Sequence, residues 1–362
     1  MDVDLVRRAT DESVLTALLG AGQLTRAEIA GLVGISRPTA SESVRRLTEL
    51  GLVVEAGRQT GGRGRSGTYC QVAPGAAFGL AVHAGPGAVI VELLDATLGA
   101  SPLVARLTEP IGLTTTTAAL NSVVAELMSR AQERAGDAVP ARVLSVAAPI
   151  DVRTSEIVRI EPSPFVLDGG SLAEVVGPQG VIDNDVAWAA MAELAARAAD
   201  GERTAFLQLY LGAGLGAALV DNGRPVQGAR GLAGEIAQVL TVGPGGRSMT
   251  LFEALAAFGL TVPGTSALDA ERVRARLTDP EVVAAVAGVV MTCATLLDPG
   301  LVVLSGPWGA DPALTAAVGG VVSQRMPHRV ILDGPRVTHE ASLRGARAHA
   351  LAMARARLLA RV

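Results

Sequence analysis

The chain has 362 residues, of which 49% are hydrophobic and 18% are charged, and its formal net charge is −4. This composition is that of a folded protein with room for one small and two medium domains, and it excludes a disordered chain. The negative net charge also excludes a global basic field around the protein, so any DNA binding requires a local basic patch.

The two cysteines, Cys70 and Cys293, are too few and too far apart to form a disulfide framework or a zinc site. The N-terminal residues contain no apolar signal-peptide core, and the apolar stretch 282–297 is shorter than the roughly 20 residues of a membrane span. We therefore expect a cytoplasmic protein without a membrane segment. Every basic side chain is an arginine, which suits bidentate contacts to phosphate or guanine but equally fits a coding bias.

A helix predicted over 4–19, with Val6, Val14, Leu15, Leu18 and Leu19 on its packing side, precedes a helix-turn-helix pattern over 24–54. Within that pattern, Thr25 and Glu28 form a capping box that begins a short helix, and Gly34 permits the turn after it. Ser36 is a suitable N-cap for a second helix, whose first turn tolerates Pro38.

The second helix has the pattern of a DNA recognition helix. Ala40, Val44 and Leu47 repeat at helical spacing and are expected to face inward. The polar residues between them are expected to face outward, where the helix can enter the major groove. The candidate DNA contacts on this helix are Arg37, Thr39, Ser41 and Arg45, with Glu42 on the same outer face. Taken alone, this pattern is also typical of a small helical hairpin with a polar outer face.

The sequence after the second helix favours a wing. Strands are predicted over 52–55 and 68–72, and the Gly-rich stretch between them carries Arg63 and Arg65. The glycines allow the backbone to come close to a phosphate or a narrow minor groove, so both arginines are candidate DNA contacts. By itself, the Gly-Arg-Gly-Arg sequence also fits a solvated linker.

From residue 78 onward, strands and helices alternate, which predicts an α/β architecture. Strands are expected at 79–83, 88–94, 142–147, 204–211, 217–221, 301–305 and 328–332, and helices at 118–135, 186–199, 232–240, 249–258, 281–297 and 343–361. Asn222-Gly223 predicts a hairpin turn. We expect a winged domain over 1–72, a linker over 73–77, a first lobe over 78–199, a second lobe over 200–342 and a closing helix over 343–362.

The chain resembles the ROK family (repressor, open reading frame, kinase), in its regulator branch with an N-terminal winged helix. The resemblance covers nearly the whole chain and depends on the order of individually weak motifs: 61–65 in the wing, 149–151, 183–185 leading into Ala187 and Glu193, 211–216, 231–236, 297–299 and 301–306. The resemblance implies an actin-like, ribonuclease-H-like two-lobed sugar-kinase fold. It also implies a sugar site between the lobes and commonly a dimer.

Five residues are candidate ligand contacts. Asp185 matches the aspartate that takes the proton from the sugar hydroxyl in family kinases, although an Asp there could also cap the following helix. Asn184 offers a donor and an acceptor to a hydroxyl. Glu235 and Glu253 match glutamates that contact the sugar, and Gln238 stands where the family has a histidine. Glu253 also fits an ordinary exposed helical glutamate.

The phosphoryl-transfer residues depart from the family pattern. The family's first phosphate loop reads Asp-x-Gly-x-Thr, whereas the best match here is 83–87, with His83 in place of the acid and Gly87 in place of the threonine. A neutral imidazole does not supply the charge that helps to hold Mg²⁺. We expect a plain surface or core histidine at 83. Gly212, Gly214 and Gly216 resemble a remnant of the second phosphate loop, but they also fit a tight hairpin kept for packing.

The family's structural zinc ligands have no counterpart. Gln238 replaces the histidine ligand, and the region 244–252 contains none of the family's cysteines. We therefore expect no zinc and no cofactor.

Two functions follow from the sequence. The first is a DNA-binding transcriptional regulator, more commonly a repressor in this family, that binds a double-stranded operator as a homodimer or tetramer and senses a sugar-type effector. The second is an ATP-dependent sugar kinase with an added DNA-binding arm. A weaker alternative is a vestigial pocket in a domain that only dimerises.

Overall fold

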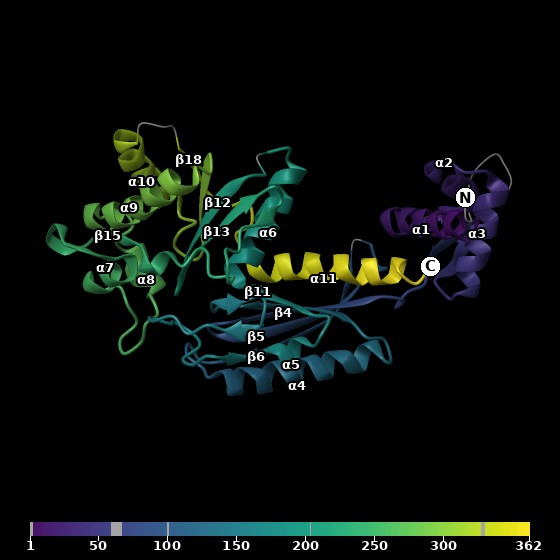
Figure 1. Cartoon of the computed structure of the whole chain (residues 1–362), viewed down its shortest axis with the longest axis horizontal. Coiled ribbons are helices and arrows are strands. Elements are labelled where there is room, and N and C mark those ends of the chain that lie inside the picture. The colour runs from purple at the N-terminus through teal and green to yellow at the C-terminus, as the bar shows by residue number, and fades with distance from the viewer. Residues whose placement is uncertain (1–2, 59–66, 100, 203, 327–329) are drawn as a thin grey trace.

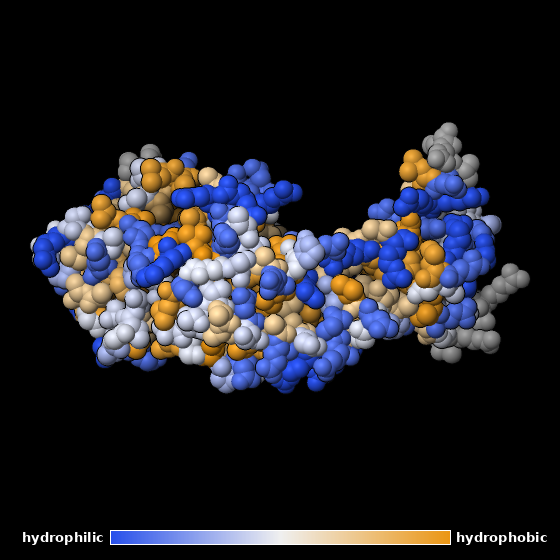
Figure 2. Space-filling model, turned by 60° about the horizontal axis from the view of Figure 1, so that its bottom comes forward, coloured by the Kyte–Doolittle hydropathy of each residue, from blue (hydrophilic) through white to orange (hydrophobic). Residues whose placement is uncertain are grey.

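The computed structural model describes residues 3–58, 67–99, 101–202, 204–326 and 330–362. Figure 1 shows a small helical head at one end and two α/β lobes, with a long helix running from between the lobes to the head. In the space-filling view the molecule is elongated, and a hollow separates the head from the second lobe (Figure 2). The boundaries expected at 72, 77, 199 and 342 remain our proposal for how the chain divides.

The head is a winged helix. It consists of α1 (Val3–Ala21), β1 (Gln23–Thr25), α2 (Arg26–Val33), α3 (Arg37–Glu49), β2 (Val53–Arg58) and β3 (Thr68–Val72), with sheet order β1-β3-β2. The capping box is confirmed: the Thr25 N–H donates to Glu28 Oε2 at 2.7 Å and the Glu28 N–H donates to Thr25 Oγ1 at 3.3 Å. Gly34 adopts φ 76°, where a residue with a Cβ is strained, and so ends α2.

The packing of the head is largely as predicted. Ala40, Val44 and Leu47 are buried against Val14, Leu15 and Leu18 of α1 in one apolar cluster. The prediction for Val6 is wrong, because this side chain is 46% exposed. It lies in the first turns of α1, on a part of the helix whose side chains remain open to solvent.

Lobe 1 is built on a five-stranded sheet of order β11-β7-β4-β5-β6. Its strands are β4 (Phe78–Gly85), β5 (Ala88–Asp95), β6 (Leu103–Pro110), β7 (Ala141–Val146) and β11 (Val181–Asn184). β4, β5 and β6 are antiparallel neighbours, whereas β4, β7 and β11 run parallel. Helix α4 (Thr117–Ala135) contributes its apolar side to the core on one face. Three short strands and a helix follow β7: β8 (Ile150–Asp151), β9 (Glu156–Ile157), β10 (Gly170–Ser171) and α5 (Ala173–Val176).

Lobe 2 repeats this plan. Its sheet has the order β14-β13-β12-β17-β18, formed by β12 (Phe206–Leu211), β13 (Leu215–Asp221), β14 (Arg224–Pro225), β17 (Leu301–Ser305) and β18 (Ile331–Asp333). The predicted Asn222-Gly223 turn joins β13 to β14. The remaining elements are the 3₁₀ turns at Ile236–Gln238 and Pro244–Gly246, β15 (Leu240–Val242), β16 (Ser248–Thr250), α7 (Leu251–Ala257), α8 (Ala270–Arg274), α9 (Pro280–Leu297) and α10 (Pro312–Arg325). Together the two lobes form the predicted actin-like α/β fold.

The predicted helix over 232–240 is wrong, since only a 3₁₀ turn forms there. Gly231 and Gly234 have φ of 81° and 102°, which are not helical angles. Gly234 also lies so close to β13 that an added Cβ would stand 1.9 Å from the Ala217 carbonyl oxygen. This contact, rather than the local apolar pattern, determines the path of the segment.

Two long helices cross between the lobes. These are α6 (Asp185–Ala199) and α11 (Ala341–Leu359). At the crossing, Gly345 lies against α6 so closely that a Cβ there would be 1.9 Å from the Trp188 carbonyl oxygen. The far end of α11 joins the head: Ala354 and Leu358 are part of the same buried cluster as the α1 core. The backbone carbonyl of Val362 accepts a 2.8 Å hydrogen bond from Arg8.

Helix α9 is the one helix in the described part of the chain that is long and apolar enough, by length and composition, to cross a membrane. Half of that window is buried inside the protein. Val282, Val286 and Val289 are fully buried in the core of lobe 2, so α9 is the buried helix that the sequence predicts.

Candidate functional site

The outer face of α3 carries the predicted DNA contacts. Ser36 caps the helix by accepting the Thr39 N–H at 3.2 Å, and its hydroxyl lies 2.7 Å from the Thr39 hydroxyl. Arg37, Thr39, Ser41 and Arg45 are all exposed, as the helical spacing predicts. The structure therefore brings these four residues to one accessible surface of the head. Their contact with DNA stays a prediction.

A buried polar network, not foreseen from the sequence, fixes α3 on α1. Asp11 is only 7% exposed and accepts hydrogen bonds from Arg46 Nε at 2.9 Å, Arg46 Nη2 at 2.6 Å and the Ser43 hydroxyl. Arg46 is therefore engaged with α1 rather than directed to solvent. The sequence signal was Ser43, a polar residue at an inward position of the helix.

The wing begins and ends as predicted, with β2 and β3 paired antiparallel. Arg63 and Arg65, the candidate DNA contacts at its tip, lie outside the described residues. Their role remains a prediction from the sequence.

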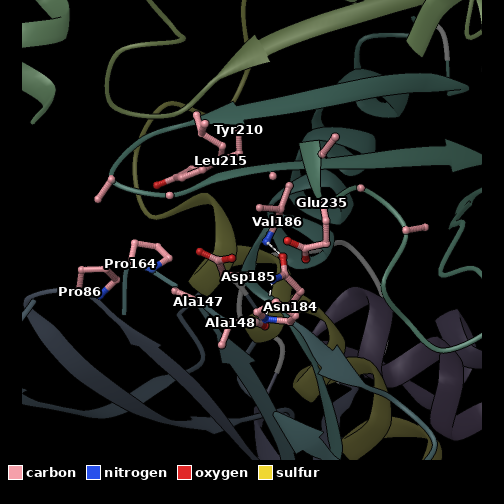
Figure 3. A pocket seen from close by; sticks show the side chains of 17 residues that line it. Pro86, Ala147, Ala148, Pro164, Asn184, Asp185, Val186, Tyr210, Leu215 and Glu235 are labelled. Carbon is pink, nitrogen blue, oxygen red and sulfur yellow. Dashed lines mark hydrogen bonds between the residues drawn. The ribbon is translucent and has the colours of Figure 1, made fainter. Parts of the chain in front are cut away.

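A second candidate site is a cavity of about 110 Å³ between the two lobes. Figure 3 shows residues from both lobes around it, with Asp185 and Glu235 on neighbouring sides. The start of α6, the β12–β13 turn and the ends of β7 and β11 meet here, so the cavity lies where strands of both sheets end. The described lining residues are Pro86, Ala147, Ala148, Pro149, Pro164, Asn184, Asp185, Val186, Tyr210, Ala213, Gly214, Leu215, Gly216, Ala217, Ala233, Gly234 and Glu235.

Asn184, rather than Asp185, is the N-cap of α6. Its Oδ1 accepts the Val186 N–H at 2.8 Å, and its Nδ2 donates to the Ala148 carbonyl at 3.0 Å. Both the oxygen and the nitrogen of the Asn184 amide are thus hydrogen-bonded to the backbone, and the residue lines the cavity (Figure 3). Because Asn184 supplies the cap, the Asp185 carboxyl is not needed for that purpose.

Asp185 and Glu235 form an acidic pair in this cavity. Asp185 is 9% exposed. Burial raises its pKa to about 7, with a further contribution from the Glu235 carboxylate and an opposing one from the Val186 N–H. Burial likewise raises the pKa of Glu235 to about 7. No arginine or histidine is among the described lining residues, so neither carboxyl has a cationic partner in the cavity.

Tyr210 is a cavity residue that the sequence reasoning missed. It lines this cavity and also a neighbouring one of about 350 Å³ that includes His83 and Ser305. It lies two residues after Gln208 in β12, so the two side chains share one face of the strand, and it packs against the cluster that contains Val186 of α6. The only signal for Tyr210 in the sequence was its position in the predicted strand 204–211, where every second side chain lies on the same face.

His83 is a half-buried core residue, in agreement with the simpler expectation for it. Its Nδ1 lies 3.2 Å from the hydroxyl of the fully buried Ser145. Burial lowers its pKa to about 4, so the imidazole is neutral at physiological pH. An imidazole in this state brings no negative charge to the β4–β5 turn.

The three glycines of the predicted phosphate-loop remnant separate into two roles. Gly214 and Gly216 line the cavity, whereas Gly212 is packed between Tyr210 and Pro307. An added Cβ would stand 2.8 Å from the Tyr210 ring at Gly212 and 2.9 Å from Val186 at Gly216. Close packing thus explains at least two of these glycines without a bound phosphate.

Gln238 and Glu253 are not among the residues that line the cavity. Gln238 is exposed and donates to the Glu161 carbonyl. Glu253 is exposed and completes a capping box with Thr250 at the start of α7. The structure therefore brings together Asn184, Asp185 and Glu235 but places these two elsewhere. No group of three or more His, Cys, Asp or Glu side chains in the described part of the chain is arranged to hold a metal ion.

The head and the lobes together define a class: a kinase-like α/β protein with a winged helix attached. The sequence model for winged helix-turn-helix DNA-binding domains matches residues 7–54, and the model of the ROK family matches residues 99–245. The chain thus joins an N-terminal winged helix-turn-helix to a ROK-family domain. No curated protein matches the sequence.

Solved structures share this fold. A ROK family transcriptional regulator, described as a homologue of the E. coli MLC protein, covers 98% of both chains with a TM-score of 0.64 and 16% identity. A ROK hexokinase from Thermus thermophilus covers 74% of this chain and 96% of its own, with a TM-score of 0.55 and 24% identity. A putative N-acetylmannosamine kinase from Listeria monocytogenes covers 76% and 99%, with a TM-score of 0.56 and 19% identity. At these identities the similarity establishes the fold.

Proposed function

We propose that this protein is a DNA-binding transcriptional regulator, acting as a repressor, whose ROK domain senses a sugar-type effector. The observation that carries the proposal is the α3 surface, where a winged helix presents Arg37, Thr39, Ser41 and Arg45 to solvent. The regulator among the similar structures is matched over 98% of this chain, whereas the two kinases, each matched over nearly its whole length, cover only 74% and 76% of it. We further propose that it works in the cytoplasm as a homodimer.

The effector site in this proposal is the cavity between the lobes. Asp185 and Glu235 would accept hydrogen bonds from hydroxyl groups, and the Asn184 amide would orient the start of α6 beside them. A ligand that contacts both lobes shifts the equilibrium between more open and more closed arrangements. Because α11 connects this region with the head, such a shift would alter the placement of the DNA-binding surface.

The direct test is affinity selection of fragmented genomic DNA on the purified full-length protein, followed by sequencing. An inverted repeat with half-sites about one or two helical turns apart is the expected result. Genes beside the recovered sites would then guide the choice of effector. No enrichment at either low or moderate salt, with and without a panel of sugars, would refute the regulator proposal.

Arg37→Ala should weaken binding to the selected operator by about 1–3 kcal/mol, because Arg37 is exposed in the first turn of the recognition helix. Fluorescence anisotropy with a labelled duplex measures the affinity. Arg130→Ala is the matched control, since Arg130 is also an exposed helical arginine but lies on α4 in lobe 1. Equal affinities for Arg37→Ala and the unmodified protein would remove Arg37 from the interface.

The second candidate function is an ATP-dependent sugar kinase, favoured by Asp185. A buried carboxyl with a pKa near 7 at the cavity is suited to accept a proton from a hydroxyl. Opposing it, His83, which the resemblance matches to the metal-binding acid of the family's first phosphate loop, is a neutral side chain. A coupled ADP-release assay over a sugar panel should show no turnover. Turnover that Asp185→Asn abolishes would establish the kinase instead.

A further inference from the structure

The recognition surface carries acidic as well as basic side chains. Glu42, which follows Ser41 on the outer face of α3, has 51% of its side chain exposed. Glu49, at the last position of the helix, has 61% exposed. A carboxylate on a helix that approaches DNA is repelled by the phosphates, so its presence needs a compensating contact.

Glu42 holds Arg45 in a defined orientation. Arg45 Nε donates to Glu42 Oε2 at 3.0 Å and Nη2 donates to Oε1 at 2.7 Å, while Nη1 donates to Glu49. This pairing lowers the pKa of Glu42, so the carboxylate is ionised at neutral pH. Arg46 Nη1 lies 3.5 Å from the same carboxylate. The Arg45 guanidinium is therefore already paired with two carboxylates of its own helix, Glu42 and Glu49, before any DNA is bound.

Arg37 differs from Arg45 in this respect. Within the part of the chain that the structure describes, the exposed Arg37 guanidinium has no ion pair and no hydrogen bond to the protein. It is available to any phosphate or guanine that comes near. The outer face thus combines one uncommitted arginine with one that its neighbours occupy.

The chemistry of the major groove gives an ionised carboxylate few partners. Most base edges there present acceptors, and the usual donor for Glu or Asp is the N4 amino group of cytosine. A carboxylate therefore gains a hydrogen bond at a suitably placed cytosine and is repelled at positions that present only acceptors. Discrimination by repulsion of the wrong sequence is a general route to specificity.

We propose that Glu42 determines operator specificity by accepting a hydrogen bond from a cytosine N4 amino group, while orienting Arg45 for a neighbouring contact. This inference rests on the proposed function as a DNA-binding regulator. It adds to the arginines of this surface, which suit phosphate and guanine contacts, an acidic residue that suits cytosine.

The test is selection from a random duplex library with three forms of the full-length protein: unmodified, Glu42→Gln and Glu49→Gln. A glutamine amide pairs with the N6 and N7 groups of adenine, so Glu42→Gln should change one cytosine in each half-site toward adenine. It should also bind unrelated duplex DNA more tightly, because a negative charge has been removed from the interface. On the original operator, we expect about a tenfold loss of preference for the cytosine over its substitutes.

Glu49→Gln is the matched control. It also removes a carboxylate that contacts Arg45, but Glu49 lies at the C-terminal end of α3, away from the N-terminal residues that enter the groove. Its selected sequence should equal that of the unmodified protein. Circular dichroism verifies the fold of both variants, whose changed side chains are exposed.

The outcomes separate the two proposals. An unchanged selected sequence for Glu42→Gln, or a uniform gain in affinity for all sequences with no base change, overturns the role of Glu42. A base change in Glu49→Gln equal to that in Glu42→Gln overturns it as well, since general loss of Arg45 orientation would then explain both. Failure of the unmodified protein to select any sequence refutes the regulator proposal itself, and this inference with it.

Discussion

Arg197→Met should lower the free energy of unfolding by about 3–5 kcal/mol. Arg197 is only 1% exposed and pairs with the equally buried Glu193, with Nε donating at 2.7 Å. Its other nitrogens donate to Glu202 at 2.8 Å and to Asp333 at 3.2 Å, so it ties α6 to the end of β18. Without the arginine, the buried Glu193 carboxylate loses its cationic partner, and an unpaired buried charge accounts for most of the lost stability.

Denaturant unfolding of the full-length protein, followed by circular dichroism, measures this effect. Arg130→Met is the matched control: Arg130 and Glu126 form the same four-residue helical spacing, but both side chains are at least half exposed. Pairs of that kind contribute about 0.3–0.5 kcal/mol. If Arg197→Met and Arg130→Met lose similar stability, the buried ion pairs of Arg197 do not stabilise the packing of α6 against the end of β18.

The stability of the protein should contain a component that falls as pH rises from about 4 to about 7, and Asp185→Asn should remove much of it. The pKa of Asp185 is raised from 3.8 to about 7 in the folded state, so the folded protein binds a proton that the unfolded chain has released. The stabilisation is therefore complete below pH 4 and lost as pH passes 7. Its size is on the order of 2–4 kcal/mol for Asp185.

Unfolding midpoints at pH 4.5, 6 and 8 give the measurement, compared between Asp185→Asn and the unmodified protein. The comparison matters because His83, with its pKa lowered to about 4, acts in the opposite direction over an overlapping range. Glu235 retains part of the effect in the variant, since burial raises its pKa independently. Glu126→Gln, on the exposed face of α4, controls for the loss of a carboxyl group. Parallel pH profiles for all three proteins would contradict the raised pKa of Asp185.

Local signals in the sequence were sufficient for much of the fold. The Thr25–Glu28 capping box, the Ser36 cap and the Asn222-Gly223 turn act within a few residues, and each forms as predicted. Strand β6 was not predicted because it is an edge strand with little burial on either face, so its sequence lacks a buried alternation. The 232–240 segment was mispredicted because contact with β13, distant in sequence, overrides its apolar pattern.

In the candidate sites, too, local features could be predicted from the sequence, whereas contacts between distant segments could not. The outward face of α3 follows from helical spacing, but the pairing of Asp11 with Arg46 joins two helices and cannot be deduced from either one. Asp185 and Glu235 were named from the family pattern, and their proximity required the two lobes to be placed. Tyr210 was missed because a single aromatic residue in a strand reads as ordinary core. Gln238 and Glu253 were named by motif position, yet the structure uses one to contact Glu161 and the other to cap α7.

The end of α11 also bears on when the DNA-binding head can form. Ala354 and Leu358 complete the apolar cluster that holds Val14 and Leu18, so the head is not finished by its own first 72 residues. During synthesis those residues leave the ribosome long before the helix that covers them, and domains ordinarily fold in that order. The head of a nascent chain therefore keeps an incomplete core until residue 358 has been added. A fragment that ends before α11 would therefore carry the recognition helix on a head whose core lacks Ala354 and Leu358.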